Sequence, residues 1–214
     1  MIIAIDGPAA SGKSSTAKLL AKELNITYIN TGAMYRACAL YAINKGVKIS
    51  KNRELKSLIK NIEIEFRGSQ ILLNGVNVTE RIGMEDISKA SSEIAVIGFV
   101  RNAMVELQRE MGKQGSVVLE GRDIGSVVFP KADYKFFVVA DVRIRAKRRL
   151  KELSAKGVKT TLEDVKNELI WRDKNDSTRK ISPLVRTNDA IDVDTSKLSI
   201  MQQVEFIKKI VISR

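Results

Sequence analysis

Residues 7–14 place two glycines, a lysine and a serine in an order that is suited to binding phosphate. The segment Gly7-Pro-Ala-Ala-Ser-Gly12-Lys13-Ser14 matches the pattern G-x-x-x-x-G-K-[ST]. Glycines at its two ends allow the backbone to turn successive N–H groups toward phosphate oxygens. Lys13 can reach the β- and γ-phosphates of a nucleotide, and the Ser14 hydroxyl can contact Mg²⁺ directly or through water. The motif predicts a phosphate-binding loop (P-loop) that holds ATP or GTP with Mg²⁺.

The elements on either side of the loop supply the context that this motif requires. Ile2 to Ile5 form a short apolar run, which is typical of a strand buried on both faces of a parallel sheet. After the loop, a helix opened by Ser14 and Ser15 carries Ala17, Leu20, Ala21 and Leu24 on one face. The N-terminus of that helix would point at the same anion. A glycine-rich turn without a ligand is the alternative, and this context favours the P-loop.

Arginines and carboxylates form a second group of residues that could do chemistry. Glu120, Arg122 and Asp123 follow a buried strand, so we expect them at the carboxyl end of the sheet, where doubly wound folds bind ligands. Arg172, Asp176 and Arg179 recur at spacings of four and three, which aligns them on one helical face if the helix continues. Arginine suits bidentate phosphate binding. Each one alone could be a solvated surface charge, but their occurrence with a P-loop favours a site.

Alternation of strands and helices predicts the elements that position these residues. Apolar runs recur at Val117–Leu119, Phe136–Ala140 and Ala190–Val193, and Tyr28-Ile29 supplies a fifth strand. Helical patterns cover Ala33–Lys45, Phe99–Met111 and a C-terminal segment with Ile200, Val204, Ile207 and Val211 on one face. We therefore predict the α/β class, with a parallel five-stranded sheet flanked by helices.

One stretch departs from this alternation. Residues 62–67 alternate apolar and charged side chains, Gly68-Ser69 turns, and Asn74-Gly75 separates two further short apolar runs. An Asn-Gly pair between apolar runs is a strong hairpin signal. We predict a small antiparallel β insert at about residues 60–85. The core then covers about 1–59 and 86–214, and the whole chain 1–214 forms a single unit.

Composition excludes several classes of chemistry. The chain has 214 residues, no His, one Cys (Cys38) and a formal net charge of +12. Zinc sites that need His, His-based catalytic triads and disulfides are therefore excluded, and Cys38 is predicted to be core packing. The positive charge is compatible with nucleic acid, a membrane surface or a polyanionic substrate. No apolar run approaches the roughly 20 residues of a membrane helix, so we expect a cytoplasmic protein.

Six segments together resemble the bacterial cytidylate kinase family, one of the nucleoside monophosphate kinases. They are Ile5-Asp-Gly-Pro-Ala-Ala-Ser-Gly-Lys-Ser14, Thr31-Gly-Ala-Met-Tyr-Arg36, Gly121-Arg-Asp-Ile-Gly125, Arg172-Asp-Lys-Asn-Asp176 with Arg179, Ser182-Pro-Leu184 and Asp192-Val-Asp-Thr195. The resemblance covers almost the whole chain, including the position of the insert. The P-loop is shared with many enzymes, whereas the second and third segments are much more specific.

The resemblance implies a P-loop kinase core and transfer of the γ-phosphoryl group of ATP to CMP or dCMP, with Mg²⁺. Nothing in the sequence demands more than a monomer, and we expect it to act on free nucleotides and not on nucleic acid or at a membrane. The implied ATP ligands are Gly7, Pro8, Ala9, Ala10, Ser11, Gly12, Lys13, Ser14 and Ser15, with Arg145, Arg148 and Arg149 from a mobile helical lid at about residues 143–162. The implied CMP ligands are Thr31, Tyr35, Arg36, Ser92, Arg101, Arg122, Asp123, Arg172, Asp176 and Arg179. Lys13, Arg36, Arg122 and Arg179 are the implied catalytic residues.

The resemblance also assigns parts of CMP to particular side chains. Arg36, Arg122 and Arg179 would bind the acceptor phosphate, and Arg172 with Asp176 would hold the ribose hydroxyls. Ser92, Arg101 and Asp123 would bind cytosine, because a carboxylate can accept from the N4 amine and an arginine can donate to O2 and N3.

Three positions depart from the family pattern. Glu120 stands where family members usually carry Asp before Gly-Arg-Asp, Asn30 also replaces a common Asp, and Gly83 replaces the Arg of an Ile-Arg-Thr segment, with Arg81 nearby. A kinase for UMP, AMP or GMP is the nearest alternative. A nucleic-acid-dependent P-loop ATPase is another, although aromatic residues make up only 5% of the chain. A P-loop scaffold without catalysis is the third, and Lys13 with the arginines argues against it.

Overall fold

The computed structural model describes residues 1–213, which divide into two compact units. Unit 1 comprises Met1–Tyr28 and the chain from Gly115 onward, and unit 2 comprises Ile29–Gln114. Unit 1 therefore contains the P-loop and the segment with Arg122 and Asp123. The predicted β insert lies within unit 2, which extends beyond it in both directions along the chain.

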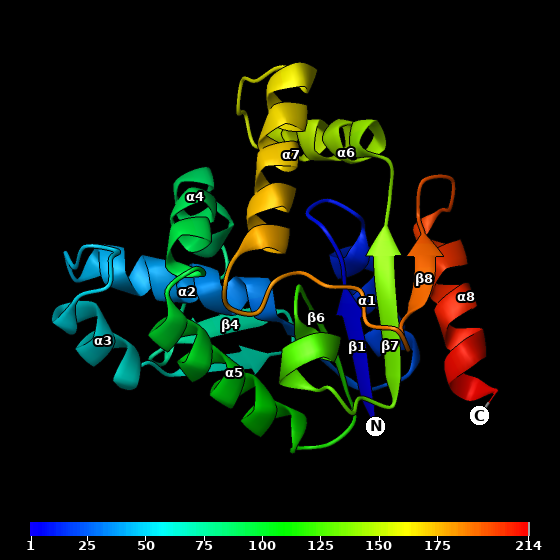
Figure 1. The fold of residues 1–214 in the computed structure, drawn as a ribbon, viewed down its shortest axis with the longest axis horizontal. Helices are drawn as coiled ribbons and strands as arrows, with labels where there is room; N and C mark the ends of the chain where they lie inside the picture. The colour runs from blue at the N-terminus through cyan, green and yellow to red at the C-terminus, as the bar shows by residue number, and fades with distance from the viewer. Residues whose placement is uncertain (214) are drawn as a thin grey trace. The chain divides into compact units, whose positions relative to one another are not determined.

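A five-stranded sheet with the order β2-β6-β1-β7-β8 organises the fold (Figure 1). Its strands are β1 (Ile2–Asp6), β2 (Thr27–Asn30), β6 (Val117–Gly121), β7 (Tyr134–Val139) and β8 (Ile191–Asp194). β1 pairs in parallel with β6 and β7, and β7 pairs in parallel with β8. The predicted α/β class and all five predicted strands are confirmed.

Register brings two functional segments to the same edge of this sheet. Asp6, the last residue of β1, lies opposite Gly121, the last residue of β6. The P-loop leaves β1 after Asp6, and Arg122 leaves β6 after Gly121. A short π-helical turn, η2 (Ile124–Val128), follows directly. The carboxyl edge of the parallel strands is where folds of this class bind ligands.

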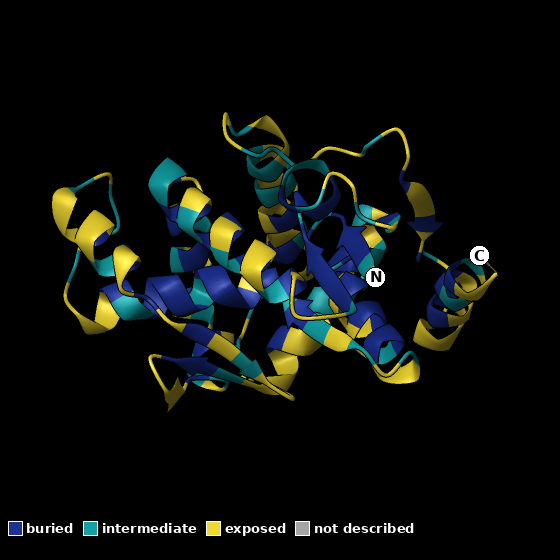
Figure 2. Ribbon diagram, turned by 90° about the horizontal axis from the view of Figure 1, so that it is seen from below, coloured by how far each residue is buried: buried dark blue, intermediate teal, exposed yellow. Residues whose placement is uncertain are grey.

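The core of unit 1 lies between the sheet and two helices, α1 (Lys13–Glu23) and α8 (Ile200–Ile212). Ile5, Phe136 and Val138 from the strands pack with Leu20 of α1 and with the apolar stripe of α8 in one buried cluster. Figure 2 shows the central strands of the sheet largely in dark blue; β6 is buried at every residue and β1 at every residue but Ile2. A capping box at Ser199 starts α8, since its hydroxyl accepts from the N–H of Gln202 and the Gln202 side chain accepts from the N–H of Ser199.

Two long helices, α6 (Val142–Ala155) and α7 (Leu162–Thr178), pack on each other beyond the carboxyl ends of β1 and β7 (Figure 1). Asp141 caps α6 and Thr161 caps α7. A second buried cluster holds them together: Ala9, Ala146, Leu153, Val165 and Leu169. Because Ala9 belongs to the P-loop, this pair of helices is packed against the loop. The predicted lid segment covers most of α6 and the connection to α7.

Unit 2 is largely helical. Its helices are α2 (Thr31–Asn44), α3 (Arg53–Lys60), α4 (Glu85–Ile94) and α5 (Gly98–Gly112), with a short 3-10 helix η1 (Arg81–Gly83). Cys38 of α2 is fully buried, and its thiol lies 3.3 Å from the sulfur of Met104. Burial raises the pKa of the Cys38 thiol. The prediction that Cys38 packs in the core is confirmed.

The predicted insert forms a three-stranded antiparallel sheet of β3 (Ile64–Arg67), β4 (Gln70–Leu73) and β5 (Val76–Asn77). Asn74 and Gly75 join β4 to β5 with φ angles of 49° and 78°. Both angles are positive, as a two-residue hairpin turn requires, so the hairpin predicted from Asn-Gly is confirmed.

Candidate functional site

The P-loop has the backbone geometry of an anion cradle. Gly12 has a φ of 96° and ends the loop as the N-cap of α1, which has no side-chain cap. The first N–H groups of α1 therefore have no capping oxygen from the Gly12 position, which suits a helix N-terminus that binds phosphate. Gly7 is required by space, because a Cβ there would lie 2.1 Å from the carbonyl oxygen of Val138.

Lys13 is buried beside the loop. Its Nζ donates to the carbonyl oxygen of Pro8 at 3.0 Å and lies 3.9 Å from a carboxylate oxygen of Glu120. Burial lowers the pKa of Lys13 to about 7; the positive charges of Arg122 and Arg172 lower it further, and the negative charges of Glu120 and Asp176 oppose the shift. Polyanionic phosphate at this position would favour the charged ammonium.

Glu120 connects Lys13 to the hydroxyl that the motif assigns to Mg²⁺. It is buried at the carboxyl end of β6 and accepts from the Ser14 hydroxyl at 2.6 Å and from the Tyr28 hydroxyl at 3.2 Å. The longer side chain of Glu therefore reaches the start of α1, where the family pattern has Asp. Hydroxyl and carboxylate oxygens are ligands that Mg²⁺ accepts in proteins.

Arg122 lies in a partly buried cluster of charges on unit 1. Its Nε donates to Asp176 at 2.7 Å. Burial opposes the charged form of Arg122, but the charge and hydrogen bond of Asp176, with Glu120 and Asp173, raise its pKa above the ordinary value. Burial likewise opposes the charged form of Asp176, and Arg122, followed by Arg179 and Arg172, lowers its pKa.

Arg179 joins the same cluster by a different geometry from the one predicted. Helix α7 ends at Thr178, so Arg179 does not continue the helical face that Arg172 and Asp176 occupy. Its extended backbone and a hydrogen bond from Nε to the Ser182 carbonyl at 2.6 Å turn the side chain back. The guanidinium then lies 3.4 Å from Asp176 and 3.8 Å from Asp123. Asp176 thus contacts both Arg122 and Arg179.

Two of the three arginines predicted for the lid, Arg145 and Arg148, contact backbone carbonyls of the P-loop. Arg145 is buried, donates to the carbonyl oxygens of Ala9 and Ala140 at 3.1 and 3.0 Å, and pairs with Asp173 at 2.7 Å. Arg148 donates to Thr195, and its NH1 lies 3.4 Å from the Ser11 carbonyl. Arg149 lies 3.3 Å from Glu152. Contact of these three arginines with ATP stays a prediction.

Sequence reasoning missed three buried polar residues around the loop. Thr195 donates to the Ser11 carbonyl at 2.6 Å, and Gln203 of α8 accepts from Thr16 of α1. Asp6 accepts two backbone N–H groups of the turn after Asp123. For Asp6 and Thr195, the available signal was a polar residue at the end of a short apolar strand.

The remaining predicted residues belong to unit 2. Thr31 starts α2 after Asn30, whose side-chain oxygen accepts from the N–H of Ala33 at 2.9 Å, so Asn caps this helix as Asp would. Tyr35 is buried on α2, and the guanidinium of Arg101 lies 5.2 Å from its ring centre. Arg101 is 1% exposed and donates to the Ala95 carbonyl at 3.0 Å. A cation over an aromatic face is a stabilising contact.

Three further positions of unit 2 are half-buried or exposed. Arg36 of α2 and Ser92 of α4 are half-buried, and the Ser92 hydroxyl lies 3.4 Å from the Ser88 carbonyl. Arg81, which stands near Gly83, makes two hydrogen bonds with the exposed carboxylate of Asp86. Hydrogen bonding between the two side chains raises the pKa of Arg81 and lowers the pKa of Asp86.

The predicted residues are thus divided between the units. Unit 1 brings together Lys13, Ser14, Arg122, Asp123, Arg172, Asp176 and Arg179 with Glu120. Unit 2 carries Thr31, Tyr35, Arg36, Ser92 and Arg101. Within residues 1–213 there is no cluster of three or more His, Cys, Asp or Glu side chains that could hold a metal. In the same range no helix is long and apolar enough to cross a membrane.

Comparison with known proteins gives consistent matches along the chain. The sequence model of the family described as cytidylate kinase matches residues 3–213. The cytidylate kinase of Clostridioides difficile strain 630 is 47% identical over 205 residues, which cover 96% of this chain and 95% of that one. The cytidylate kinase of Fusobacterium nucleatum is 44% identical over 209 residues, which cover 98% and 96%. An uncharacterized protein from Eubacterium ventriosum has a similar fold, with a TM-score of 0.57, 16% identity, and coverage of 100% and 99%.

Proposed function

The chain belongs to the cytidylate kinase family, which makes it an ATP-dependent phosphotransferase acting on CMP, and we propose that the P-loop and the arginine cluster of unit 1 carry out this transfer. The observation that carries the assignment is the charge arrangement at the carboxyl edge of the sheet. Lys13 lies 3.9 Å from Glu120, and Arg122 and Arg179 share the Asp176 carboxylate at 2.7 and 3.4 Å. Burial and then the charges of Arg122 and Arg172 lower the pKa of Lys13. Cations from two segments therefore act on one small region.

The chemistry of the acceptor explains why this region is rich in cations and has no His. The second pKa of a phosphate monoester is about 6, so the phosphate of CMP is largely dianionic at pH 7. Its oxygen attacks the γ-phosphorus of ATP, and the bond from that phosphorus to the bridging oxygen of ADP breaks. No proton has to leave the nucleophile, so no general base is required, unlike transfer to a hydroxyl.

The barrier to this reaction is electrostatic, because two polyanions must approach each other. In our proposal the ammonium of Lys13 binds the β- and γ-phosphates, and the N-terminal N–H groups of α1 bind the same anion. Arg122, Arg179 and Arg36 neutralise the acceptor phosphate. Asp176 supports this role, because it orients Arg122 and Arg179 through one carboxylate. Arg145 and Arg148 keep the loop carbonyls fixed and, on lid closure, would exclude water.

Mg²⁺ fits the residues at the start of α1. Ser14 Oγ and Glu120 Oε1 are 2.6 Å apart, and both are oxygen donors that Mg²⁺ accepts alongside water and phosphate. The ion, when bound, neutralises charge on the phosphates of ATP. Ser14 would bind it directly or through water, and Glu120 would orient a water molecule in its shell.

Recognition of the base and the sugar is assigned to other side chains. We propose that Asp123 accepts a hydrogen bond from the exocyclic amine of cytosine and that Arg101 donates to O2 and N3, with Ser92 as a further contact. Arg172 and Asp176 bind the ribose hydroxyls, and Thr31 and Tyr35 complete the CMP site. Burial of Arg101 and its contact with Tyr35 support a fixed guanidinium.

Three further features complete the proposal. The enzyme accepts dCMP as well as CMP, and it acts as a cytoplasmic monomer. It acts on free nucleotides rather than on nucleic acid or at a membrane. The positive charge of the chain then has a partial explanation, since eight arginines (Arg36, Arg101, Arg122, Arg145, Arg148, Arg149, Arg172 and Arg179) are assigned to the two nucleotides.

A panel of acceptors with ATP tests the proposal. We expect phosphorylation of CMP and dCMP to exceed that of UMP, AMP and GMP when ADP release is measured at equal concentrations. Asp123→Asn should mainly reduce the preference for CMP over UMP. Strong transfer to AMP with none to CMP would contradict the choice of acceptor, and an unchanged CMP-to-UMP ratio in Asp123→Asn would contradict the assignment of the base contact.

A further inference from the structure

The carboxylate of Asp6 binds the turn that follows Arg122 and Asp123. Asp6 ends β1 and is 5% exposed. Its Oδ1 accepts from the N–H of Ile124 at 2.9 Å, and its Oδ2 accepts from the N–H of Gly125 at 2.7 Å. Both oxygens are therefore used on two successive backbone donors, which belong to the first turn of η2.

This contact replaces one that Asp123 would ordinarily make. Asp123 is the N-cap residue of η2, and an Asp at an N-cap usually accepts from the first N–H groups of its own helix. Here the Asp123 side chain makes no capping hydrogen bond. Asp6, on the neighbouring strand, supplies the cap instead, so the Asp123 carboxylate is not needed to satisfy the donors of the turn.

The register of β1 with β6 explains how Asp6 can fix the positions of Arg122 and Asp123. Gly121 is held opposite Asp6 by the pairing of β6 with β1, and Ile124 is held by the Asp6 side chain. Arg122 and Asp123 lie between these two fixed points. Gly125 leaves space for the Lys135 side chain, because a Cβ there would lie 3.1 Å from it, whereas the same Cβ would be in ordinary contact with Asp6 Oδ2 at 3.4 Å.

We propose that Asp6 is a positioning residue for CMP, which caps the turn in place of Asp123 and thereby holds Arg122 and Asp123 in the orientation that binds the acceptor. The inference rests on the proposed function, because Arg122 and Asp123 are CMP ligands only in that proposal. Asp6 itself does not touch the nucleotide. Its effect should therefore reach CMP, and the KM for ATP should be almost unchanged, because Asp6 holds the turn after Asp123 and the proposal places the ATP ligands in the P-loop and the lid.

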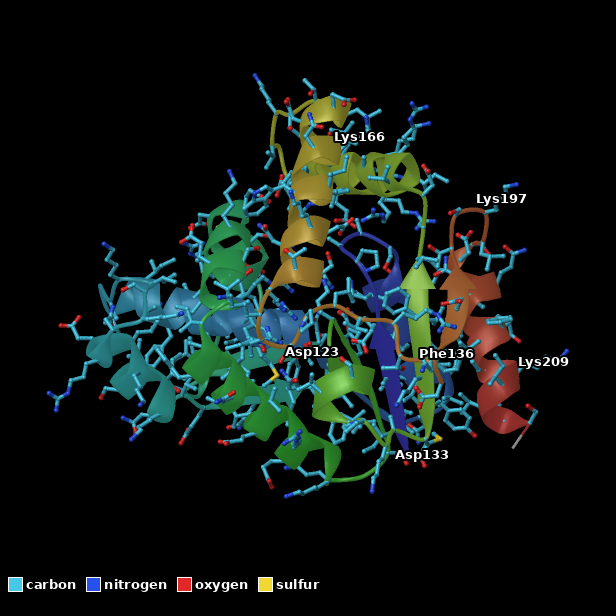
Figure 3. The ribbon with its side chains drawn as sticks, viewed as in Figure 1. Asp123, Asp133, Phe136, Lys166, Lys197 and Lys209 are labelled. Carbon is cyan, nitrogen blue, oxygen red and sulfur yellow. The ribbon has the colours of Figure 1, made fainter. Side chains whose placement is uncertain are left out.

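Asp6→Asn is the decisive variant, because Asn keeps the shape but has only one oxygen for two N–H donors. Asp133→Asn is the matched control. Asp133 Oδ2 accepts from the N–H of Ile2 at 2.6 Å, so it makes the same kind of contact near the opposite end of β1, away from the site (Figure 3). Steady-state rates with ATP, CMP and UMP would be measured for the wild type and both variants.

We expect Asp6→Asn to lower kcat/KM for CMP by about 10- to 100-fold, since small displacements of binding groups cost roughly that much. The KM for ATP should stay within about twofold of wild type, and the preference for CMP over UMP should fall. Asp133→Asn should stay near wild type in all three. Equal kinetics for the two variants, or equal losses for ATP and CMP in Asp6→Asn, would overturn the proposal.

Two comparisons keep this test decisive. If wild type phosphorylates CMP and Arg122→Lys is impaired while Asp6→Asn is not, the positioning role alone fails; if wild type does not phosphorylate CMP, the proposed function fails.

If Asp6→Asn does not fold, amide hydrogen exchange of Ile124 and Gly125 is measured in the wild type. Protection that increases when CMP is added supports the proposal, and exchange that CMP leaves unchanged overturns it.

Discussion

The two units of the chain bury charge in very different ways. Within residues 1–213, unit 1 has six charged residues in the buried class, namely Asp6, Lys13, Glu120, Asp123, Lys135 and Arg145, whereas Arg101 is the single such residue in unit 2, all of whose residues the structure describes. Charge is costly to bury unless it is paired and hydrogen-bonded. Unit 1 meets that requirement by pairing several of these charges with one another or with backbone groups, and unit 2 places its one charge over an aromatic ring.

This difference between the units predicts that catalysis depends more on the individual buried charges of unit 1 than on the buried charge of unit 2. The buried charges of unit 1 surround the P-loop and the Arg122 turn, where two polyanions would meet. Buried charges act in a lower dielectric than exposed ones, so each contributes more to stabilising the transition state. Arg101 is suited to recognition of one flat ring. Substitutions in unit 1 should therefore change turnover most, and substitution of Arg101 should change selection of the acceptor.

Lys13→Met should have the largest effect. Met has nearly the same length and no charge, so the loop would lose the cation that, in the proposed function, balances the β- and γ-phosphates. We expect kcat to fall by about 10³-fold or more, with the fold intact by circular dichroism. Lys209→Met, at an exposed lysine of α8, is the control and should be near wild type (Figure 3). A folded Lys13→Met enzyme with near-normal turnover would remove Lys13 from the mechanism.

Arg122→Lys tests whether the partly buried ion pair of Arg122 with Asp176 matters more for catalysis than a more exposed ion pair. The side chains of Arg122 and Asp176 are 17% and 18% exposed, whereas those of Arg81 and Asp86 are 39% and 56% exposed. Lysine keeps the charge but loses the planar fork that binds phosphate and carboxylate together. We expect Arg122→Lys to lower kcat/KM for CMP by about 10²-fold and Arg81→Lys to change it less than about twofold.

One result for Arg122→Lys and Arg81→Lys would contradict this prediction. If Arg81→Lys is as damaging as Arg122→Lys, burial is not what distinguishes the two ion pairs, and Arg81 takes the place of the arginine that Gly83 replaces. Rates at several CMP concentrations separate the two cases, because loss of a phosphate ligand lowers kcat/KM even when the KM for ATP is normal.

Arg101→Lys tests the single buried charge of unit 2. The ammonium of Lys cannot cover the Tyr35 ring and donate to a pyrimidine edge in the same way as the planar guanidinium. We expect the KM for CMP to rise by about tenfold and the CMP-to-UMP preference to change, with kcat at saturating CMP largely retained. Arg109→Lys, at an exposed arginine of the same helix α5, is the matched control. A pure loss of kcat with unchanged KM would place Arg101 outside base recognition.

Local patterns predicted much of the fold. The five strands, the Asn-Gly hairpin and the start of α1 follow from short-range rules about apolar runs, turn residues and glycine. Helix α7 was harder, because nothing in the sequence marks Thr178 as its end, and the hydrogen bond of Arg179 to Ser182 that turns the chain is a tertiary feature. Helices α3 and α4 were missed, since each is short and has few apolar residues.

From the sequence, the residues of the candidate site could be predicted only where they belong to a recognisable motif. The P-loop and the arginines were found by motif, but the supports of the loop were not. Arg145 and Arg148 were expected to bind ATP, which stays a prediction; each also contacts a loop carbonyl that belongs to a residue more than 130 positions away. Asp6 was overlooked because its two partners are backbone groups, which leave no trace in the pattern of side-chain types. Long-range contacts of this kind depend on the strand register.

The smallest expected effect concerns stability and makes the cost of buried charge in unit 1 measurable. Burial lowers the pKa of Lys13 from 10.5 to about 7, so the unfolded chain binds this proton more tightly than the folded chain. Below pH 7 Lys13 is charged in both states and its burial penalty is fully present. Between about pH 7 and 10.5 the unfolded chain holds more protons, so the free energy of unfolding rises with pH, and this contribution reaches its maximum above 10.5.

Lys13→Met should therefore raise the free energy of unfolding by about 1 kcal/mol at pH 6, with a gain that shrinks toward pH 10. Urea unfolding of Lys13→Met and Lys209→Met at pH 6, 8 and 10 measures this trend. A Lys13→Met protein that is less stable than wild type at pH 6 would mean that pairing with Glu120 and Pro8 outweighs burial.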